Sequence, residues 1–318
     1  MVEAVRDALE TAMADDESVV LLGQDVGRKG GVFGASRGLV ERFGPRRVLD
    51  TPIAEIAIAG AAIGAAVAGL RPVAEFQFAD YMHPAWDQIV NQAATMRWRS
   101  VGAWDVPVVF RSPCGGGVRG GVYHSQSIEA PYCHVPGLKV VMPSTPDDAF
   151  GLLLTAIRDD DPVVFFEPKR AYRLKPEAVS EDAHPLGVAR VDRAGADVTV
   201  ATYGYAVHTV RAAAEVLEAS SIDVEILDLR TLVPLDRDAI AASVRKTGRL
   251  VVVHEANRTM GFGAEIAAFA ADELFYDLDA PVVRVAADDC HLAYGVEEQA
   301  ILPDADDVVT AITSLVTS

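Results

Sequence analysis

The sequence predicts an α/β protein with two domains, each built on a mainly parallel sheet. Short apolar segments alternate with amphipathic helical segments along nearly the whole chain, which is typical of parallel sheets with helical crossovers. Two of these segments, VPVVFRS at 106–112 and PVVFFEP at 162–168, are almost continuously apolar, as in strands buried on both faces. At 318 residues, the chain is long enough for two domains.

The first half of the chain follows this alternation closely. We expect helices at residues 2–14, 36–43, 80–99 and 147–157, and strands at 19–22, 72–78, 106–112, 138–144 and 162–168. A short segment at 47–50 leads into a further helix. The glycine-rich stretch after the first strand lacks the spacing of a phosphate-binding loop, so we interpret it as an ordinary loop.

Residues 50–70, DTPIAEIAIAGAAIGAAVAGL, form the most unusual helical segment. Thr51 is a plausible N-cap and Pro52 a plausible first helical residue. The segment has no polar face, which predicts a helix buried in a core or a subunit interface. Glu55 is the exception. It either complements the helix dipole or meets a group that carries a proton.

Residues 169–195 mix charge and proline without a clear period, and we interpret them as a linker. A second α/β unit follows, with strands at 197–204, 223–232, 249–256 and 281–287 and helices at 206–218, 236–244, 263–274 and 304–315. The predicted domains are therefore residues 1–180 and 190–318.

Charge and composition exclude several functions. The net charge of -18 argues against nucleic acid or an anionic membrane as a partner. The helix at 50–70 is too short and too weakly apolar to span a bilayer. The three cysteines form no pairwise framework and no targeting peptide is evident, so we expect a cytoplasmic protein.

A second informative stretch is the glycine-rich loop CGGGVRGGVYHSQS at 114–127, which presents His124. Such a histidine can carry a proton near neutral pH, or it can be a surface residue paired with neighbouring hydroxyls. A serine hydrolase fits poorly because no GxSxG motif is present. Tyr81 is either a core aromatic or a flat face for a heterocycle. The histidine spacings do not suggest a transition-metal site.

These segments together resemble a known family. DTPIAE with its Ala/Gly helix, FADYMHPAWDQIVNQAA, YHSQS, PGLKVVMPSTPDDA, DPVVFFEPK and TGRLVVVHEA are similar to the β subunit of the E1 component of 2-oxo acid dehydrogenase complexes. That family is thiamine-diphosphate-dependent. The resemblance implies a pyrimidine-binding domain followed by a transketolase C-terminal-like domain. FADY, YHSQS and VVFFEPK are nearer the branched-chain type than the animal pyruvate type.

The resemblance also implies roles for single residues. Glu55 matches the glutamate that hydrogen-bonds the aminopyrimidine ring of thiamine diphosphate, and Tyr81 matches the aromatic packed against that ring. His124 matches the histidine that binds the 2-oxo carboxylate or transfers a proton during reductive acylation of a lipoyl group. Gln77 and Asp80 fall close by and are candidates for lining the site.

Metals and partners follow from the same resemblance. The GDG motif that binds Mg²⁺ and the diphosphate in thiamine enzymes is absent. The resemblance therefore implies that a separate α subunit supplies the Mg²⁺ ligands, in an α2β2 heterotetramer, and that a lipoyl acyltransferase, E2, accepts the acyl group. Ala156, Asp159 and Asp161, with Val108 on the adjacent strand, match the place where some members bind K⁺, largely through backbone carbonyl groups.

Residues 285–298, VAADDCHLAYGVEE, depart from the family, whose members often carry several prolines here. The expected function is oxidative decarboxylation of a 2-oxo acid with reductive acylation of lipoyl-E2. One alternative is the β subunit of an acetoin dehydrogenase or of a split transketolase-like enzyme. Another is a non-catalytic scaffold that binds an α subunit. The sequence does not distinguish pyruvate, branched-chain 2-oxo acids and acetoin.

Overall fold

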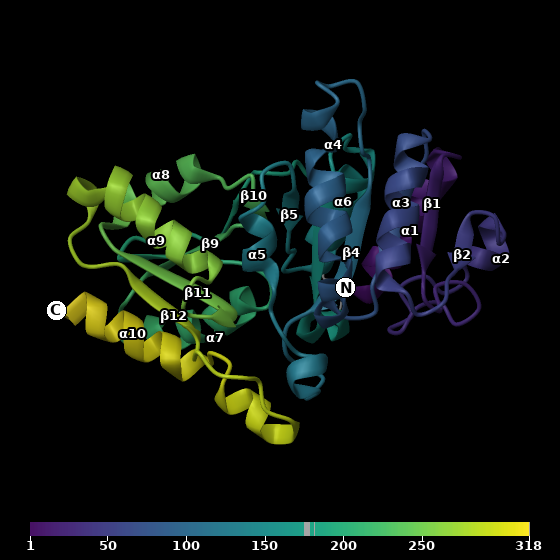
Figure 1. The fold of residues 1–318 in the computed structure, drawn as a ribbon. Coiled ribbons are helices and arrows are strands. Elements are labelled where there is room, and N and C mark those ends of the chain that lie inside the picture. Colours follow the sequence, from purple (N-terminus) through teal and green to yellow (C-terminus); the bar gives the residue numbers. More distant parts are fainter. Residues whose placement is uncertain (175–178, 181, 318) are drawn as a thin grey trace. The chain divides into compact units, whose positions relative to one another are not determined.

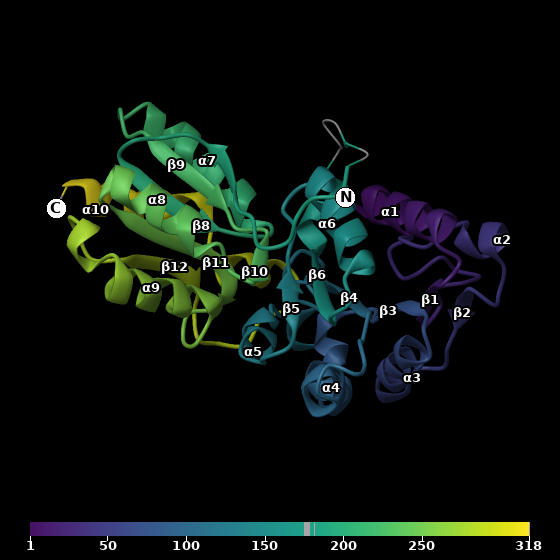
Figure 2. The same cartoon turned by 90° about the horizontal axis from the view of Figure 1, so that it is seen from above.

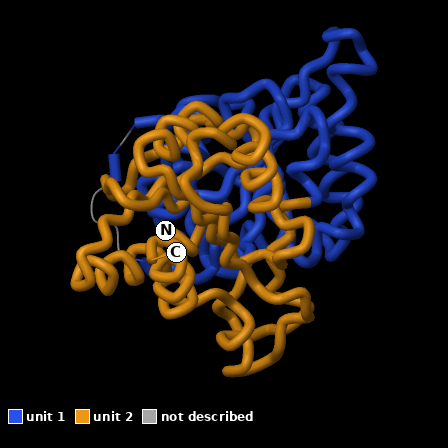
Figure 3. Tube along the Cα trace, turned by 90° about the vertical axis from the view of Figure 1, so that its left-hand side faces the viewer, with its two compact units in different colours: residues 1–114, 131–186 blue, residues 115–130, 187–318 orange. Residues whose placement is uncertain are grey.

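The computed structural model describes residues 1–174, 179–180 and 182–317, and it divides into two compact units (Figure 3). Unit 1 contains Met1–Cys114 and Pro131–Leu186, whereas unit 2 contains Gly115–Ala130 and the chain from Gly187 onward. The loop that carries His124 therefore belongs to the second unit, although it lies within the first half of the sequence. Dividing the sequence once, near residue 185, would therefore place residues 115–130 in the wrong unit.

Unit 1 is built on a parallel sheet, as the sequence predicts. Its strands follow one another across the sheet in the order β5–β6–β4–β3–β1–β2. Every residue of β1, β4 and β6 is buried, in keeping with their continuous apolar character. Their bounds are β1 Val19–Gly23, β2 Val48–Asp50, β3 Arg71–Glu75, β4 Val109–Cys114, β5 Lys139–Val141 and β6 Val163–Pro168.

Helices cover both faces of this sheet (Figures 1 and 2). Helices α1, Val2–Asp15, and α6, Pro146–Arg158, lie together on one face, and α3, Glu55–Val67, and α4, Ala94–Arg99, lie on the other. Helix α6 begins where its sequence indicates, since the Thr145 hydroxyl accepts a hydrogen bond from the Asp148 N–H at 3.2 Å. Two short helices complete the α elements of this half, α2 Leu39–Phe43 and α5 Glu129–Cys133.

The helix predicted from Thr51 starts later than expected. The Thr51 N–H donates to the Gly23 carbonyl at 2.9 Å, which holds Thr51 at the end of the sheet. Helix α3 therefore begins at Glu55, and the predicted N-cap at Thr51 is wrong. The helix is also not buried all round in this chain. Ile53, just before it, is 73% exposed and Ile56 is 55% exposed.

The single helix predicted at 80–99 is also wrong, because the segment has three conformations. A 3₁₀ helix, η1 Ala79–Ala85, is followed by a π-helix, η2 Gln88–Ala93, and then by α4. Pro84 lies within η1 and has no N–H to donate, so the regular hydrogen-bond ladder of an α-helix is not available there. The helix predicted at 36–43 shortens to α2 because Gly38 adopts a φ of +85°.

Unit 2 has a five-stranded sheet in the order β12–β11–β8–β9–β7, in which only β7 runs antiparallel. Strand β7 lies inside the predicted linker, and residues 175–178 and 181 of that linker are outside the described residues. The predicted strand at 223–232 divides at Arg230, whose φ is +56°. The five strands of this sheet are β7 Arg190–Arg193, β8 Val198–Thr202, β9 Val224–Asp228, β11 Leu250–Asn257 and β12 Val283–Ala287, and the short strand β10, Thr231–Val233, is not one of them.

Four helices flank this second sheet (Figure 1). Helices α7, Ala206–Glu218, and α10, Ala305–Thr317, pack together on one face, and α8, Arg237–Thr247, and α9, Phe262–Glu273, lie on the other. The apolar core lies between the first pair and strands β8, β9 and β11. None of the helices in the described part of the chain has both the length and the hydropathy that a membrane span requires.

Candidate functional site

In unit 1, Glu55 and Tyr81 lie close enough to interact electrostatically. Glu55 is the first residue of α3 and is half-buried. Burial raises the pKa of the Tyr81 hydroxyl above its usual range, with further contributions from the charges of Asp80 and Glu55. The ring of Tyr81 packs edge-on against Phe78, with the ring centroids 5.6 Å apart. The structure therefore brings a helix N-terminal carboxylate and an aromatic ring into one neighbourhood.

Gln77 extends this region toward the glycine-rich loop after β1. Its side-chain N–H donates to the Asp25 carboxylate at 3.4 Å, and Lys29 forms an ion pair with the same carboxylate at 3.0 Å. Asp25 itself adopts a φ of +61°, an unusual conformation for a residue other than glycine. Gln77 is therefore tied to this loop. The second neighbouring candidate, Asp80, is buried at the start of η1.

His124 lies in unit 2, directly after a single 3₁₀ turn, η3 Gly121–Tyr123. The Gly121 carbonyl accepts hydrogen bonds from the N–H groups of His124, at 3.3 Å, and Ser125, at 3.1 Å. The Gln126 side chain donates to the Val122 carbonyl at 2.6 Å. These local bonds make the loop compact. His124 is half-buried, and the neighbouring Tyr123 is 63% exposed.

A carboxylate that no local sequence pattern singles out supports this loop. Glu298, in the 3₁₀ helix η6 Gly295–Ala300, is only 1% exposed and contacts the loop through both carboxylate oxygens. In the sequence it follows another glutamate in a polar stretch, which is the usual pattern of a solvated surface. Nothing in the local pattern distinguishes it from Glu297.

Beyond Gln126 and Ser127, the loop borders a cavity of about 480 Å³ in unit 2. The cavity lies at the carboxyl ends of β11 and β12, where ligands bind in many α/β folds. Its lining includes two carboxylate side chains, those of Glu255 and Asp289. The remaining lining residues are Asn257, Thr259, Ala287, Cys290, His291, Leu292 and Ile301.

Unit 2 also contains buried titratable groups that do not line this cavity. The Tyr203 hydroxyl donates to Glu129 at 2.8 Å, and burial raises the pKa of that carboxyl. The ring of His254 stacks on Tyr203, with the centroids 6.0 Å apart. Burial lowers the pKa of His254 to about 4, so its imidazole is neutral at physiological pH.

The residues expected at a potassium site are surrounded by cationic side chains. Lys139 binds both carboxylate oxygens of Asp159 at 2.7 Å, and the Arg97 Nε donates to Asp161 at 2.6 Å. Arg71 donates to the backbone carbonyl of Asp159 at 3.0 Å. Ala156 is buried within α6. These side chains fit a monovalent cation poorly because their negative charge is already compensated, and the potassium assignment remains a prediction.

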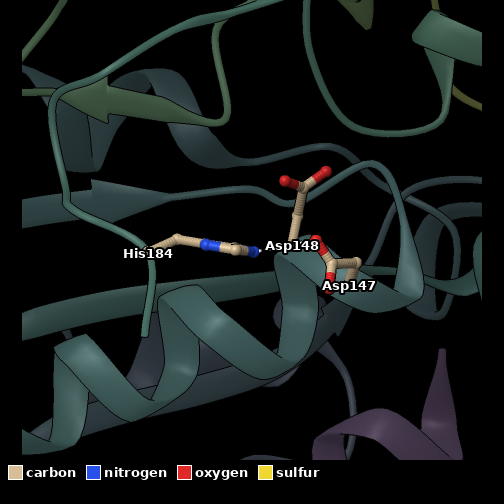
Figure 4. A group of neighbouring side chains, drawn as sticks. All are labelled: Asp147, Asp148 and His184. Carbon is tan, nitrogen blue, oxygen red and sulfur yellow. Dashed lines mark hydrogen bonds and ion pairs between the residues drawn. The ribbon is translucent and has the colours of Figure 1, made fainter. Parts of the chain in front are cut away.

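Figure 4 shows the group of potential metal ligands found in the described part of the chain, which consists of Asp147, Asp148 and His184. His184 pairs with Asp147 at 2.9 Å, and the Asp148 carboxylate accepts a hydrogen bond from the Thr145 hydroxyl at 2.6 Å. Asp147 and Asp148 lie in the first turn of α6, where the helix dipole favours carboxylates without any metal. We interpret the group as a helix N-terminus held by its own capping bonds.

Comparison with known proteins gives a consistent result for the whole chain. A family model described as transketolase, pyrimidine binding domain, matches residues 1–175. A second, described as transketolase, C-terminal domain, matches residues 187–308.

Curated relatives match along nearly their full length. The chain is 51% identical over 290 residues to the 2-oxoisovalerate dehydrogenase subunit beta of Bacillus subtilis, which covers 91% of this chain and 89% of the relative. It is 47% identical over 311 residues to the pyruvate dehydrogenase E1 component subunit beta of the same organism, covering 97% and 96%. Among solved structures, a split gene transketolase described as an inactive beta4 tetramer matches with a TM-score of 0.81 and 26% identity, over 99% of this chain and 97% of that one.

Proposed function

Because this chain belongs to the family of β subunits of 2-oxo acid dehydrogenase E1 components, we propose that it supplies half of a thiamine diphosphate site for the oxidative decarboxylation of a 2-oxo acid. The observation that carries this proposal is the proximity of Glu55, at the first turn of α3, to Tyr81. A carboxyl group and an aromatic face are the two groups that recognition of an aminopyrimidine ring requires.

Glu55 would hold a proton between its carboxyl group and a ring nitrogen of the cofactor. A carboxyl group can exchange a proton with a weak base to which it is hydrogen-bonded. Thiamine diphosphate supplies, when bound, the electron sink that decarboxylation needs.

Tyr81 would pack against the aminopyrimidine ring, and Gln77 is a candidate for a second contact with the cofactor. His124 would act at the reacting end, where it binds the carboxylate of the 2-oxo acid or transfers a proton during reductive acylation of the lipoyl group. An imidazole suits either role because its ring N–H can donate to a carboxylate and its ring nitrogens can carry a proton.

We also propose the partners of this site. An E1 α subunit would complete an α2β2 heterotetramer and supply the Mg²⁺ ligands and the diphosphate contacts, because this chain has no GDG motif. A lipoyl acyltransferase, E2, would accept the acyl group. We expect the complex to function in the cytoplasm. The higher identity to the 2-oxoisovalerate enzyme than to the pyruvate enzyme favours a branched-chain substrate.

The test is reconstitution with candidate α subunits, starting with one encoded beside this chain. Thiamine-diphosphate- and Mg²⁺-dependent decarboxylation would be measured with pyruvate and with 3-methyl-2-oxobutanoate. Cleavage of acetoin, which has no carboxyl group to lose, would be measured in parallel. We expect Glu55→Gln to lower kcat by about 10² to 10⁴, the range for loss of an acid–base group. Glu3→Gln is the matched control because Glu3 also lies in the first turn of a helix, where it is exposed.

Equal activity of the Glu55→Gln and Glu3→Gln complexes would contradict the assignment of Glu55. A stable complex that is inactive toward every 2-oxo acid would instead support a scaffold. Activity with a sugar phosphate would support a split transketolase, the description borne by the structural neighbour.

A further inference from the structure

Glu298 contacts the loop that carries His124 at two separate points. One carboxylate oxygen, Oε1, accepts a hydrogen bond from the Gly117 N–H at 2.7 Å. The other, Oε2, accepts a hydrogen bond from the Ser125 hydroxyl. Glu298 is 1% exposed and Ser125 is fully buried, so water does not compete for these bonds. The two contacts lie on opposite sides of His124 in the sequence.

The Ser125 hydroxyl also binds a third point of the loop, the backbone of Gly120. While its hydrogen is donated to Glu298, its oxygen accepts a hydrogen bond from the Gly120 N–H at 3.1 Å. Gly117, Gly120 and Ser125 are therefore all held, directly or through one hydroxyl, by the same carboxylate. His124 lies between the second and third of these points.

The segment around Glu298 also fits closely against the loop backbone. A Cβ atom at Gly121 would lie 2.6 Å from the ring of Tyr294, and one at Gly116 would lie 2.3 Å from the side chain of Leu302. The Gly295 N–H donates to the Arg119 carbonyl at 3.3 Å. Tyr294, Gly295 and Leu302 therefore pack directly against the backbone of the His124 loop.

We propose that Glu298 is a positioning residue for His124, which fixes the loop at Gly117, Gly120 and Ser125 so that the imidazole is held in place before substrate binds. This inference rests on the proposed role of His124 at the reacting end of the site. Holding the loop in advance avoids the loss of conformational entropy that ordering it during the reaction would cost.

The chemistry requires a carboxylate at this position. Two donors, an amide N–H and a hydroxyl, meet two acceptor oxygens, and a carboxylate is the side chain that offers only acceptors. In Glu298→Gln, one of the two oxygens becomes an NH₂ group. If this group faces the Gly117 N–H, two donors meet; if it faces Ser125, the hydroxyl oxygen accepts from it and the hydroxyl hydrogen loses its acceptor. Leaving a buried donor unsatisfied costs about 1–3 kcal/mol, which corresponds to a roughly five- to hundredfold increase in local opening.

The first measurement is amide hydrogen exchange of the full chain in complex with its α subunit. We expect Glu298→Gln to increase exchange in residues 115–127 by about tenfold, and Ser125→Ala to increase it at Gly120 in particular. The matched control is Glu297→Gln, which removes the neighbouring, exposed carboxylate and should leave this exchange unchanged. Unchanged exchange in the Glu298→Gln complex would overturn the proposal.

The second measurement separates positioning from general stability. Glu298→Gln should lower kcat by about tenfold while complex assembly and the KM for thiamine diphosphate stay unchanged, and it should have little further effect in a His124→Ala background. Equal effects with and without His124, or faster loop exchange with unaltered kcat, would refute the link to His124. Because the exchange experiment needs no turnover, an inactive wild-type complex would refute the proposed function separately.

Discussion

Arg111 donates hydrogen bonds to both carboxylate oxygens of Glu167, at 2.6 and 2.8 Å, from a position where both side chains are buried. It also pairs with Glu75, on the neighbouring strand β3. The Tyr172 hydroxyl donates to Glu167 at 2.6 Å. Burial raises the pKa of Glu75, whereas its proximity to Arg111 opposes that increase. This charge network joins β3, β4 and β6 at the centre of unit 1.

Replacement of Arg111 by methionine should therefore destabilise unit 1 strongly. Removing one partner of a buried ion pair leaves an uncompensated charge and costs about 3–5 kcal/mol. All three tryptophans, Trp86, Trp98 and Trp104, lie in unit 1, so urea denaturation followed by tryptophan fluorescence reports on this unit. Arg158→Met, which removes an exposed pair with Asp15, should cost less than about 1 kcal/mol. Comparable losses in the two variants would contradict this prediction.

His254 should make unit 2 less stable in mild acid. Its pKa is about 4 in the folded protein and about 6.5 when exposed, so the unfolded chain binds a proton between these values that the folded chain does not. Stability is fully present above pH 6.5 and decreases as the pH falls toward 4. From pH 7 to pH 5 we expect a loss of about 2 kcal/mol from this residue.

The measurement compares urea denaturation of the wild type and His254→Phe by far-UV circular dichroism at the two pH values. The phenylalanine variant keeps the stacking on Tyr203 and loses the titrating group, so its stability should fall less between pH 7 and pH 5. His134→Phe, at an exposed position, should show the wild-type pH dependence. An unchanged pH dependence in His254→Phe would mean that this histidine does not titrate as described.

Tyr81→Leu should weaken thiamine diphosphate binding in the reconstituted complex while kcat at saturating cofactor stays close to that of the wild type. An aromatic contact is worth about 0.5–1.5 kcal/mol beyond its buried area, which corresponds to a roughly two- to tenfold higher dissociation constant. Titration calorimetry with the cofactor measures this directly. Tyr81→Phe should bind normally, and weak binding by both variants would assign the contribution to the hydroxyl group instead of the ring.

The potassium assignment can be tested by exchanging Na⁺ for K⁺ at constant ionic strength and recording the melting temperature. Since Lys139 and Arg97 already compensate Asp159 and Asp161, we expect no difference between the two salts. A higher melting temperature in K⁺ would reveal a site built from backbone carbonyl groups. Lys139→Met provides an internal check, because it frees the Asp159 carboxylate and should introduce a preference for a cation.

Most helices and strands could be predicted because the spacing of apolar residues in the sequence indicates which side of each element is buried. The helix expected at 206–218 coincides with α7, and continuous apolar runs correctly indicated β4 and β6 in a parallel sheet. The fold class and the family resemblance are confirmed by the two matching domain models. The start of α3 was missed because a long-range bond from Thr51 to Gly23 overrides the local capping signal.

Only some residues of the candidate site could be proposed from the sequence, and their roles stay predictions. Glu55 could be singled out because a carboxylate contrasts with the apolar helix that follows it, and His124 because it follows a glycine-rich run. Glu298 gave no such signal, since it lies among polar residues and its burial depends on contacts 173 positions away in the sequence. The placement of the His124 loop in unit 2 likewise depends on contacts that no local pattern encodes.

The hydrogen bond between Ser125 and Glu298 also determines when, during translation, the His124 loop can be anchored. The two residues are 173 positions apart, so a ribosome adding roughly 5–20 residues per second completes Glu298 roughly 10–35 s after Ser125. Strands β1 to β6, the last of which ends at Pro168, are all synthesised well before Glu298, while the His124 loop has no carboxylate to hold it. A nascent or C-terminally truncated chain therefore carries an unanchored loop, and the loop is secured only when nearly the whole polypeptide has been made.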